Sequence, residues 1–258
     1  MKPAPRSVTI AALPLLALAA AASAGPLTPP SGVIQSTMKT LMEVEPRIAI
    51  NATNTPGDSD SIFRISQPGS YYLTGNVPGA IGESGIEIAA SGVTIDLNGF
   101  DVAGVTGSLN GVSSSGTLSG VTVKNGTVRG WGASGVALPS VTGVIVRDVI
   151  ALSNAGSGIV CGASASVSGC VVRQNIAGGI LCGERAVVTN CVSTLNGGTG
   201  IQVGNASVVS GCSADDNGGE GISVSFLSHA SGNTSSRNTR AGILASSSCI
   251  VVDNTVSE

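Results

Sequence analysis

The second half of the chain carries a short-range pattern of apolar and polar residues that is interrupted at regular intervals. In VSGCVVRQNIAGGILCG (167–183), apolar positions alternate over two to four residues before Gly, Ser or Asn breaks the run. An alternation with a period of two is typical of strands, whose successive side chains point to opposite faces. No window sustains the period of about 3.6 residues of an amphipathic helix. The pattern therefore predicts short strands separated by corners.

The interrupted pattern is also a sequence repeat. The chain continues with VTNCVSTLNGGTGIQVG (188–204), which places Cys, Asn and Gly-Ile at equivalent positions 21 residues later. The equivalent residues form columns: Gly158, Gly179, Gly200, Gly221 and Gly242, each followed by Ile; Asn154, Asn175, Asn196, Asn217 and Asn238; Val146, Val167, Val188, Val209, Ala230 and Val251; and Val149, Cys170, Cys191, Cys212, Asn233 and Asn254. In VTVKNGTVRGWGASG (121–135) the same rhythm recurs, with Trp131 at the Asn position.

A fixed interval has a direct structural meaning when one repeat is one turn of a solenoid. Equivalent residues then stack at about 4.8 Å as neighbours on parallel strands. We predict an all-β parallel solenoid of about 8 coils of 21–26 residues that starts near Gly85 and becomes regular from about residue 135. Each repeated Asn is expected at a corner, where Asn tolerates left-handed geometry and bonds the Asn of the next coil in a ladder. The Gly before each Ile is expected to meet a requirement of the backbone.

These motifs carry a resemblance to a known family. Gly-Ile-x-x-Gly, Val-x-x-Cys and the corner Asn resemble the right-handed parallel β-helix repeats of the pectin-lyase-like superfamily. The segments FRISQPGSYYLTGN (63–76), GIEIAASGVTIDLNGF (85–100) and KNGTVRGWG (124–132) resemble a group of exported bacterial β-helix proteins. The resemblance covers residues 46–258 and implies the fold. It does not imply one activity, because this architecture hosts lyases, hydrolases, epimerases, adhesins and scaffolds.

The first 24 residues are typical of a signal peptide. Lys2 and Arg6 precede an apolar run at 8–22, and Ala-Ser-Ala at 22–24 supplies the small-x-small pattern of a cleavage site. We therefore expect cleavage after Ala24 and a secreted, periplasmic or cell-surface protein. No later stretch approaches about 20 continuous apolar residues, so no membrane span is expected in the mature chain.

The remaining chain divides into a short leading segment and the solenoid. Residues 25–55 are expected to be a linker and the start of an N-terminal cap, and residues 56–258 are expected to be the β-helix domain. Glu258 falls inside a coil. A solenoid needs a polar terminal cap, so we expect either that the chain is a fragment or that another element covers this end.

The composition fits a solenoid and argues against nucleic acid as a partner. Only 10% of the residues are charged and 2% are aromatic, against about 25% charged in an ordinary domain. Removing Lys2 and Arg6 with the signal peptide changes the net charge from −3 to −5. Binding to phosphate backbones needs clustered cations, which this chain lacks.

The cysteines fall in repeat columns. Five of the 6 Cys occupy two columns, Cys161 with Cys182 and Cys170 with Cys191 and Cys212, where other repeats place Val, Ala or Asn. That exchange is typical of small buried side chains, so free thiols are expected rather than disulfides. No metal site is predicted, because zinc ligands must converge and His229 is the sole His. His229 is likewise expected to be an exposed residue rather than part of a catalytic triad.

The candidate chemistry is a small charged strip. Lys124 and Arg147 share a column one coil apart, Asp96 is expected one coil below Lys124, and Asp148 follows Arg147. Lyases of acidic polysaccharides bind the substrate carboxylate with Arg or Lys, often beside Ca²⁺ held by carboxylates. The alternative is a group of salt bridges that keeps a charge-poor rod soluble. A second cluster, formed by Arg173, Asp215, Asp216 and Arg237, is expected at one corner.

Two functions stay open on the sequence alone. The preferred interpretation is an exported scaffold or surface binding protein that contacts polysaccharide and has no cofactor. The alternative is a polysaccharide lyase or epimerase that acts on acidic glycans at Asp96, Lys124 and Arg147, with Ca²⁺ as cofactor. A third candidate is an adhesin passenger. The family's Asn-Thr-Asp and Gly-His-Gly motifs are absent, and one Trp and two Tyr offer little surface for stacking sugars. The oligomeric state stays open.

Overall fold

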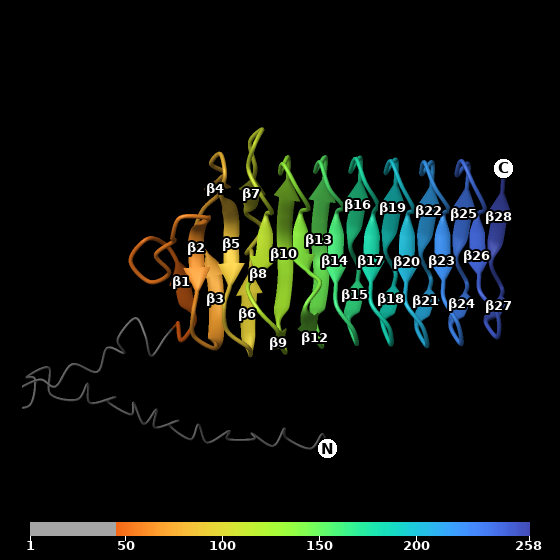
Figure 1. Cartoon of the computed structure of the whole chain (residues 1–258), viewed down its shortest axis with the longest axis horizontal. Coiled ribbons are helices and arrows are strands. Elements are labelled where there is room, and N and C mark those ends of the chain that lie inside the picture. The colour runs from red at the N-terminus through yellow and green to blue at the C-terminus, as the bar shows by residue number, and fades with distance from the viewer. Residues whose placement is uncertain (1–44) are drawn as a thin grey trace, which may run out of the picture. The chain divides into compact units, whose positions relative to one another are not determined.

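The computed structural model describes residues 45–258, which form a parallel β-helix (Figure 1). The predicted signal peptide at 1–24 and most of the predicted linker lie outside the described residues. Every regular element in the described part is a strand, as the alternating pattern predicts. No helix that could span a membrane was found among these residues.

Three flat faces are built from strands that recur once per coil. Two of the faces form a single 17-stranded sheet, because β10 (Thr122–Arg129) and β13 (Ile145–Leu152) continue from one face to the next. The third face is a separate 9-stranded sheet. A 2-stranded sheet of β9 (Leu118–Ser119) and β12 (Val141–Thr142) lies at one corner.

The first face also contains β1 (Ile48–Ile50), β3 (Gly69–Leu73), β6 (Val93–Asp96), β15 (Ser166–Ser168), β18 (Val187–Thr189), β21 (Val208–Ser210), β24 (His229–Ser231) and β27 (Ile250–Val252). The second face also contains β4 (Val77–Pro78), β7 (Asp101–Ala103), β16 (Val171–Arg173), β19 (Val192–Thr194), β22 (Ser213–Asp215), β25 (Thr234–Ser236) and β28 (Thr255–Ser257). The third face contains β2 (Ser61–Ile65), β5 (Ser84–Ile88), β8 (Val112–Ser114), β11 (Val136–Leu138), β14 (Ile159–Cys161), β17 (Ile180–Cys182), β20 (Ile201–Val203), β23 (Ile222–Val224) and β26 (Ile243–Ala245).

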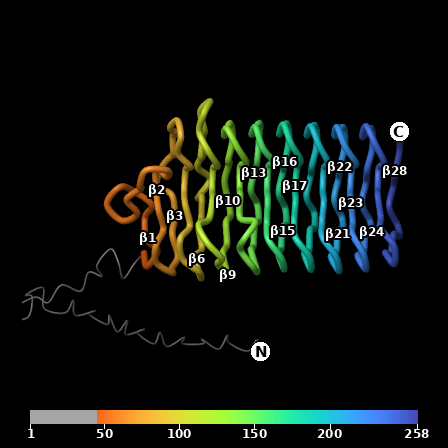
Figure 2. Tube along the Cα trace, in the orientation of Figure 1, coloured from red at the N-terminus to blue at the C-terminus, as the bar shows by residue number. Residues whose placement is uncertain are grey.

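The register confirms that the sequence interval is one coil. Ile180 pairs with Ile201 in parallel strands, and Asn154 bonds Asn175, a partner 21 residues along the chain. Figure 2 shows the chain trace as a stack of such coils. The stack has about ten turns rather than the predicted eight. The difference arises at the start, where β1 pairs with β3 and β3 pairs with β6, so the stack begins before Gly85, where the prediction began it.

The corners are made by single residues in the left-handed conformation, and this corrects one expectation. The ladder Asn residues do not themselves have positive φ; the residue before each one does. These residues are Ser153, Gln174, Leu195, Asp216 and Arg237, with φ of 54°, 57°, 57°, 54° and 51°. The Asn side chain is therefore needed for its hydrogen bonds, and the turn geometry is carried by its neighbour.

The asparagine ladder is confirmed and runs inside the solenoid. The side-chain nitrogen of Asn175 donates to Oδ1 of Asn196 at 2.9 Å, and the backbone N–H of Asn175 donates to the same oxygen at 3.1 Å. Asn154, Asn196 and Asn217 repeat this arrangement, and the last acceptor is Asn238. At the other end, the backbone N–H of buried Trp131 donates to Asn154 Oδ1 at 3.1 Å. Each buried amide is thus satisfied by its neighbour one coil away.

The cysteine column continues into a second ladder that sequence analysis missed. Cys170, Cys191 and Cys212 are buried and carry free thiols. Hydrogen bonding to the Cys170 thiol, together with burial, raises the pKa of Cys191 to about 12. In the next coils the same column holds Asn233, whose Nδ2 donates to Oδ1 of Asn254 at 2.9 Å. A protonated thiol and a paired amide therefore serve the same small interior position.

The repeated Gly is required by close packing rather than by a positive φ. A Cβ atom on Gly179 would lie 2.1 Å from Oγ of Ser193 and 2.4 Å from the carbonyl oxygen of Gly200. Gly158, Gly200 and Gly221 meet the same obstruction from the ladder amide and the next coil. The backbone at this corner passes too close to the adjoining coil for any side chain.

Candidate functional site on the first face

One outward column of the first face brings the predicted strip together. In the parallel register Asp96 pairs with both Tyr72 and Lys124, and Lys124 pairs with Arg147. The column therefore runs from Tyr72 through Asp96 and Lys124 to Arg147, one residue per coil. Tyr72, Lys124 and Arg147 are partly or largely exposed, whereas Asp96 is 7% exposed. Beyond Arg147 the column continues with hydroxyl side chains, at Ser168, Thr189, Ser210 and Ser231.

Asp96 is the most constrained residue of the strip. Its Oδ1 accepts hydrogen bonds from the backbone N–H of Asn98 at 2.9 Å and from Nδ2 of Asn125 at 3.1 Å. Its Oδ2 lies 3.2 Å from Nζ of Lys124 and 3.4 Å from Nη1 of Arg47. Burial alone would raise the pKa of Asp96, but the bonds from Asn98, Asn125 and Lys124 outweigh it and lower the pKa. Asp96 is therefore a fixed negative charge and a poor proton donor at neutral pH.

Arg47 joins the strip from a segment that the sequence placed in the leading cap. Its guanidinium lies 4.6 Å from the centroid of the Tyr72 ring and is held by both carboxylate oxygens of Glu45 at 2.8 Å. Arg47 and Tyr72, with Glu45 and Asn54, also line a cavity of about 250 Å³ beside the strip. Sequence analysis missed Arg47, because no repeat column reaches back to it. The sequence feature that could have indicated an additional cation here was Tyr72, which pairs with Asp96 in the register.

Arg147 and Asp148 form the exposed end of the strip. Nη1 of Arg147 lies 3.5 Å from Oδ2 of Asp148, and the two side chains are 44% and 58% exposed. Asp148 has a φ of 55°, so it occupies a left-handed corner position. Asn125 occupies the same corner position, with a φ of 58°. A loose surface ion pair of this kind contributes little to stability, which leaves the Arg147 guanidinium available to an incoming anion.

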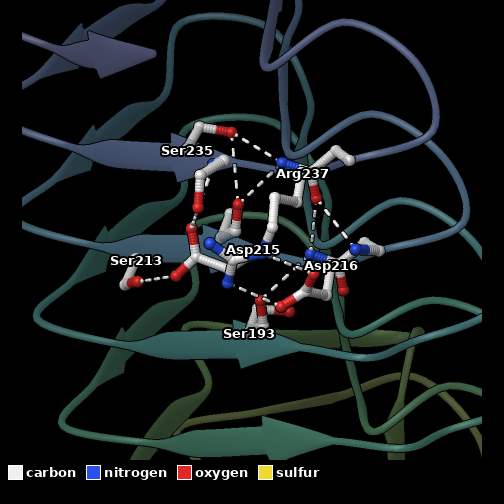
Figure 3. Close-up of polar contacts among 10 residues, drawn as sticks. Ser193, Ser213, Asp215, Asp216, Ser235 and Arg237 are labelled. Atoms are coloured by element: carbon white, nitrogen blue, oxygen red, sulfur yellow. Dashed lines mark hydrogen bonds and ion pairs between the residues drawn. The ribbon is translucent and has the colours of Figure 1, made fainter. Parts of the chain in front are cut away.

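Three residues of the predicted corner cluster, Asp215, Asp216 and Arg237, lie together, whereas Arg173 pairs with Thr194 and lies two coils from Asp215. Asp216 accepts two hydrogen bonds from Arg237, each at 2.8 Å, and Asp215 accepts bonds from Ser213 and Ser236 (Figure 3). The Arg237 guanidinium lowers the pKa of Asp216. Every charged group drawn in this cluster has its partner in the adjoining strand or corner. These bonds link neighbouring coils, so the cluster is better explained as structural.

A group of carboxylates that the sequence did not reveal lies near the start of the third face. One oxygen each from Asp58, Asp60 and Glu87 lie within 4.8 Å of one another. Arg64 contacts two of the three, at 2.6 Å from Asp58 and 3.7 Å from Glu87. Hydrogen bonds from Ser61 and Arg64 lower the pKa of Asp58, and the bond with Asp58 raises the pKa of Asp60. The arginine supplies the positive charge that a cation would bring.

His229 does not form a catalytic triad within the described part of the chain. It lies in β24, where its register partners are Val208 and Ile250. Its Nε2 is buried and has no hydrogen-bond partner among the residues described. The imidazole is therefore less exposed than the sequence suggested, and both of its register partners are aliphatic.

The comparison with protein families identifies the fold. The model of the right-handed β-helix region matches residues 69–207, which include Asn154, Asn175 and Asn196 of the asparagine ladder and the whole Asp96–Arg147 strip. The chain belongs to the right-handed β-helix family. No curated protein matches its sequence.

Solved structures with low sequence identity share the fold of this chain. The enzymatically active domain of tailspike protein 2 from bacteriophage CBA120 is 15% identical, with a TM-score of 0.61 over 81% of this chain and 42% of its own. A periplasmic alginate epimerase is 14% identical, with a TM-score of 0.56 over 73% and 51%. A pectate lyase is 14% identical, with a TM-score of 0.55 over 78% and 67%.

These likenesses establish the β-helix fold and no more. The chain spans about half the length of the first two proteins. At identities near 15%, one β-helix does not inherit the catalytic residues of another. The function of the strip therefore depends on its own residues and their geometry.

Proposed function

We propose that this protein is an exported β-helix that binds acidic polysaccharide on its first face. The observation that carries the proposal is the register of Lys124 and Arg147, which presents two cations on adjacent strands. Arginine and lysine recognise carboxylates through charge-assisted hydrogen bonds, and a guanidinium can bond both oxygens at once. The likeness to the alginate epimerase and the pectate lyase supports a carbohydrate ligand, because the names of both proteins state a polysaccharide and both have the same fold.

Asp96 favours binding over proton transfer. A general acid must hold a proton near neutral pH, whereas the pKa of this carboxyl group is lowered. Its two oxygens are also occupied by donors from Asn98, Asn125 and Lys124. In this proposal Asp96 holds Lys124 in place, and Arg147 makes the first contact with the ligand.

The test is binding of an acidic polysaccharide to the wild-type protein and to Lys124→Ala and Arg147→Ala variants, measured by calorimetry. Loss of a charge-assisted hydrogen bond should weaken binding about tenfold in Arg147→Ala, and Lys124→Ala should also weaken it, because that variant leaves Asp96 without its cation in the column. Arg173→Ala is the matched control, because Arg173 is an exposed arginine on β16 of the second face. Equal losses in all three variants would show that general charge, and not this site, attracts the glycan.

The alternative of a lyase or epimerase is tested with the same proteins. The wild-type protein is incubated with polymers of uronic acids, with and without Ca²⁺, and chain length and sugar configuration are measured. Turnover that Lys124→Ala and Arg147→Ala abolish would replace the binding function with catalysis. Binding without turnover supports the proposal.

A further inference from the structure

The strip is electrically balanced, and this restricts the ligand it can bind. It contains three cations, Arg47, Lys124 and Arg147, and each lies within ion-pair distance of a carboxylate: Glu45 for Arg47, Asp96 for both Arg47 and Lys124, and Asp148 for Arg147. The three carboxylates cancel the three cations. The site therefore has no net charge with which to attract a polyanion from a distance.

The surroundings do not add positive charge along the column. After Arg147 the next residues in the same column are Ser168 and Thr189, and the hydroxyl side chains continue to Ser231. Hydroxyl groups both donate and accept hydrogen bonds, as the hydroxyl groups of neutral sugars do. A glycan that lies along this face would find cations at one end and hydroxyl groups along the rest.

Asp96 occupies the place that a second ligand carboxylate would need. Its Oδ2 receives both Lys124 and Arg47, and the residue is 7% exposed, so a ligand cannot displace it easily. A carboxylate that approached Lys124 would lie beside this fixed negative charge. Among the described residues, the carboxylate within ion-pair distance of Arg147 is that of exposed Asp148, at 3.5 Å, so the guanidinium can still bond one ligand carboxylate.

We propose that Asp96 makes the site selective for glycans with isolated carboxylates among neutral sugars, and against glycans in which every sugar is charged. The inference rests on the proposed function and specifies its ligand. A ligand with one carboxylate bonds Arg147 and places neutral sugars on the hydroxyl column. A ligand with closely spaced carboxylates must place the others near Glu45, Asp96 and Asp148, where like charges repel.

The first experiment uses the wild-type protein and three tetrasaccharides, which carry no carboxylate, one carboxylate, and a carboxylate on every sugar. Binding is measured by calorimetry at low and at physiological ionic strength. The tetrasaccharide with one carboxylate should bind at least as tightly as the fully charged one, and its affinity should depend weakly on salt. Tighter binding of the fully charged ligand, by about tenfold at low salt, would overturn the inference and leave the proposed function intact. Failure of both acidic ligands to bind better than the neutral one would remove the proposed function, and this inference with it.

The second experiment removes the fixed charge. Asp96→Asn keeps an oxygen for the bonds from Asn98 and Asn125, and it should raise the affinity for the fully charged tetrasaccharide about fivefold. The affinity for the ligand with one carboxylate should change less than about twofold. Asp216→Asn is the matched control, because it removes the same charge from an ion pair at another corner. An equal gain in both variants would overturn the inference, and so would the absence of a gain in a folded Asp96→Asn protein. The wild-type comparison decides the question if that variant does not fold.

Discussion

The irregular coils at 48–143 and the regular coils at 144–258 maintain the same fold by different means. The regular coils stack identical side chains, so each amide of the ladder bonds an identical amide. The irregular coils have no such column of paired amides, although ion pairs join coils in both regions, as Lys124 does with Asp96 and Arg237 does with Asp216. The turn after β7 also projects beyond the even row of corners (Figure 1). The charged strip lies where these irregular coils give way to the regular ones. Uniform stacking provides stability, and specific chemistry requires a departure from it.

Trp131 lies at the junction of the two regions, and its removal should have the largest effect. The side chain is 1% exposed, its Nε1 donates to the carbonyl of Val102 at 2.9 Å, and its backbone N–H bonds the first ladder amide. Trp131→Ala should lower the free energy of unfolding by about 3–5 kcal/mol, because it leaves a cavity and an unpaired carbonyl. Urea unfolding followed by circular dichroism measures the loss. Trp131→Phe should cost clearly less, and a similar cost for both would mean that the indole N–H bond dominates.

Breaking the ladder within the regular coils should cost somewhat less. Asn196→Leu removes the acceptor of Asn175 and the donor to Asn217 inside a buried column. The free energy of unfolding should therefore fall by about 3 kcal/mol. Because coils interact mainly with their neighbours, the circular dichroism transition should shift more than the fluorescence of Trp131, which reports the junction. Asn54→Leu is the control, since Asn54 is exposed outside the repeat and should change stability by less than about 0.5 kcal/mol. Coincident shifts of both probes would indicate that the two regions unfold as one unit.

The smallest expected effect concerns the charged strip and depends on pH. The pKa of Asp96 is lower in the folded protein than the ordinary value of about 3.9. A lowered folded pKa contributes stability that is complete above the unfolded pKa and is lost as the pH falls through the folded pKa. The free energy of unfolding should therefore be larger for the wild type than for Asp96→Asn at pH 7. This difference between the two proteins should become smaller as the pH falls below about 4. A difference in free energy of unfolding that stays constant between about pH 7 and pH 3 would show that Asp96 does not titrate in this way.

The sequence predicted the fold where repetition made the register visible. The Gly-Ile and Asn columns specified which residues stack, and Ile180 lies opposite Ile201 as that interval requires. The earlier coils could not be counted, because their lengths differ and β1 lies in a segment assigned to the cap. The reasons for individual residues also needed coordinates. The repeated Gly is required by the backbone of the adjoining coil, and the left-handed residue is the one before each Asn.

The amino-acid sequence by itself determined the solenoid. When coils stack in register, residues one repeat apart in the sequence become neighbours in space, and this holds for every coil. The sequence also placed Lys124 beside Arg147, since both lie in adjoining coils with a readable register. Only the tertiary structure brought Arg47 and Tyr72 to Asp96 and so made the strip electrically balanced. Contacts between coils of unequal length depend on how each turn folds, and no periodicity in the sequence records that.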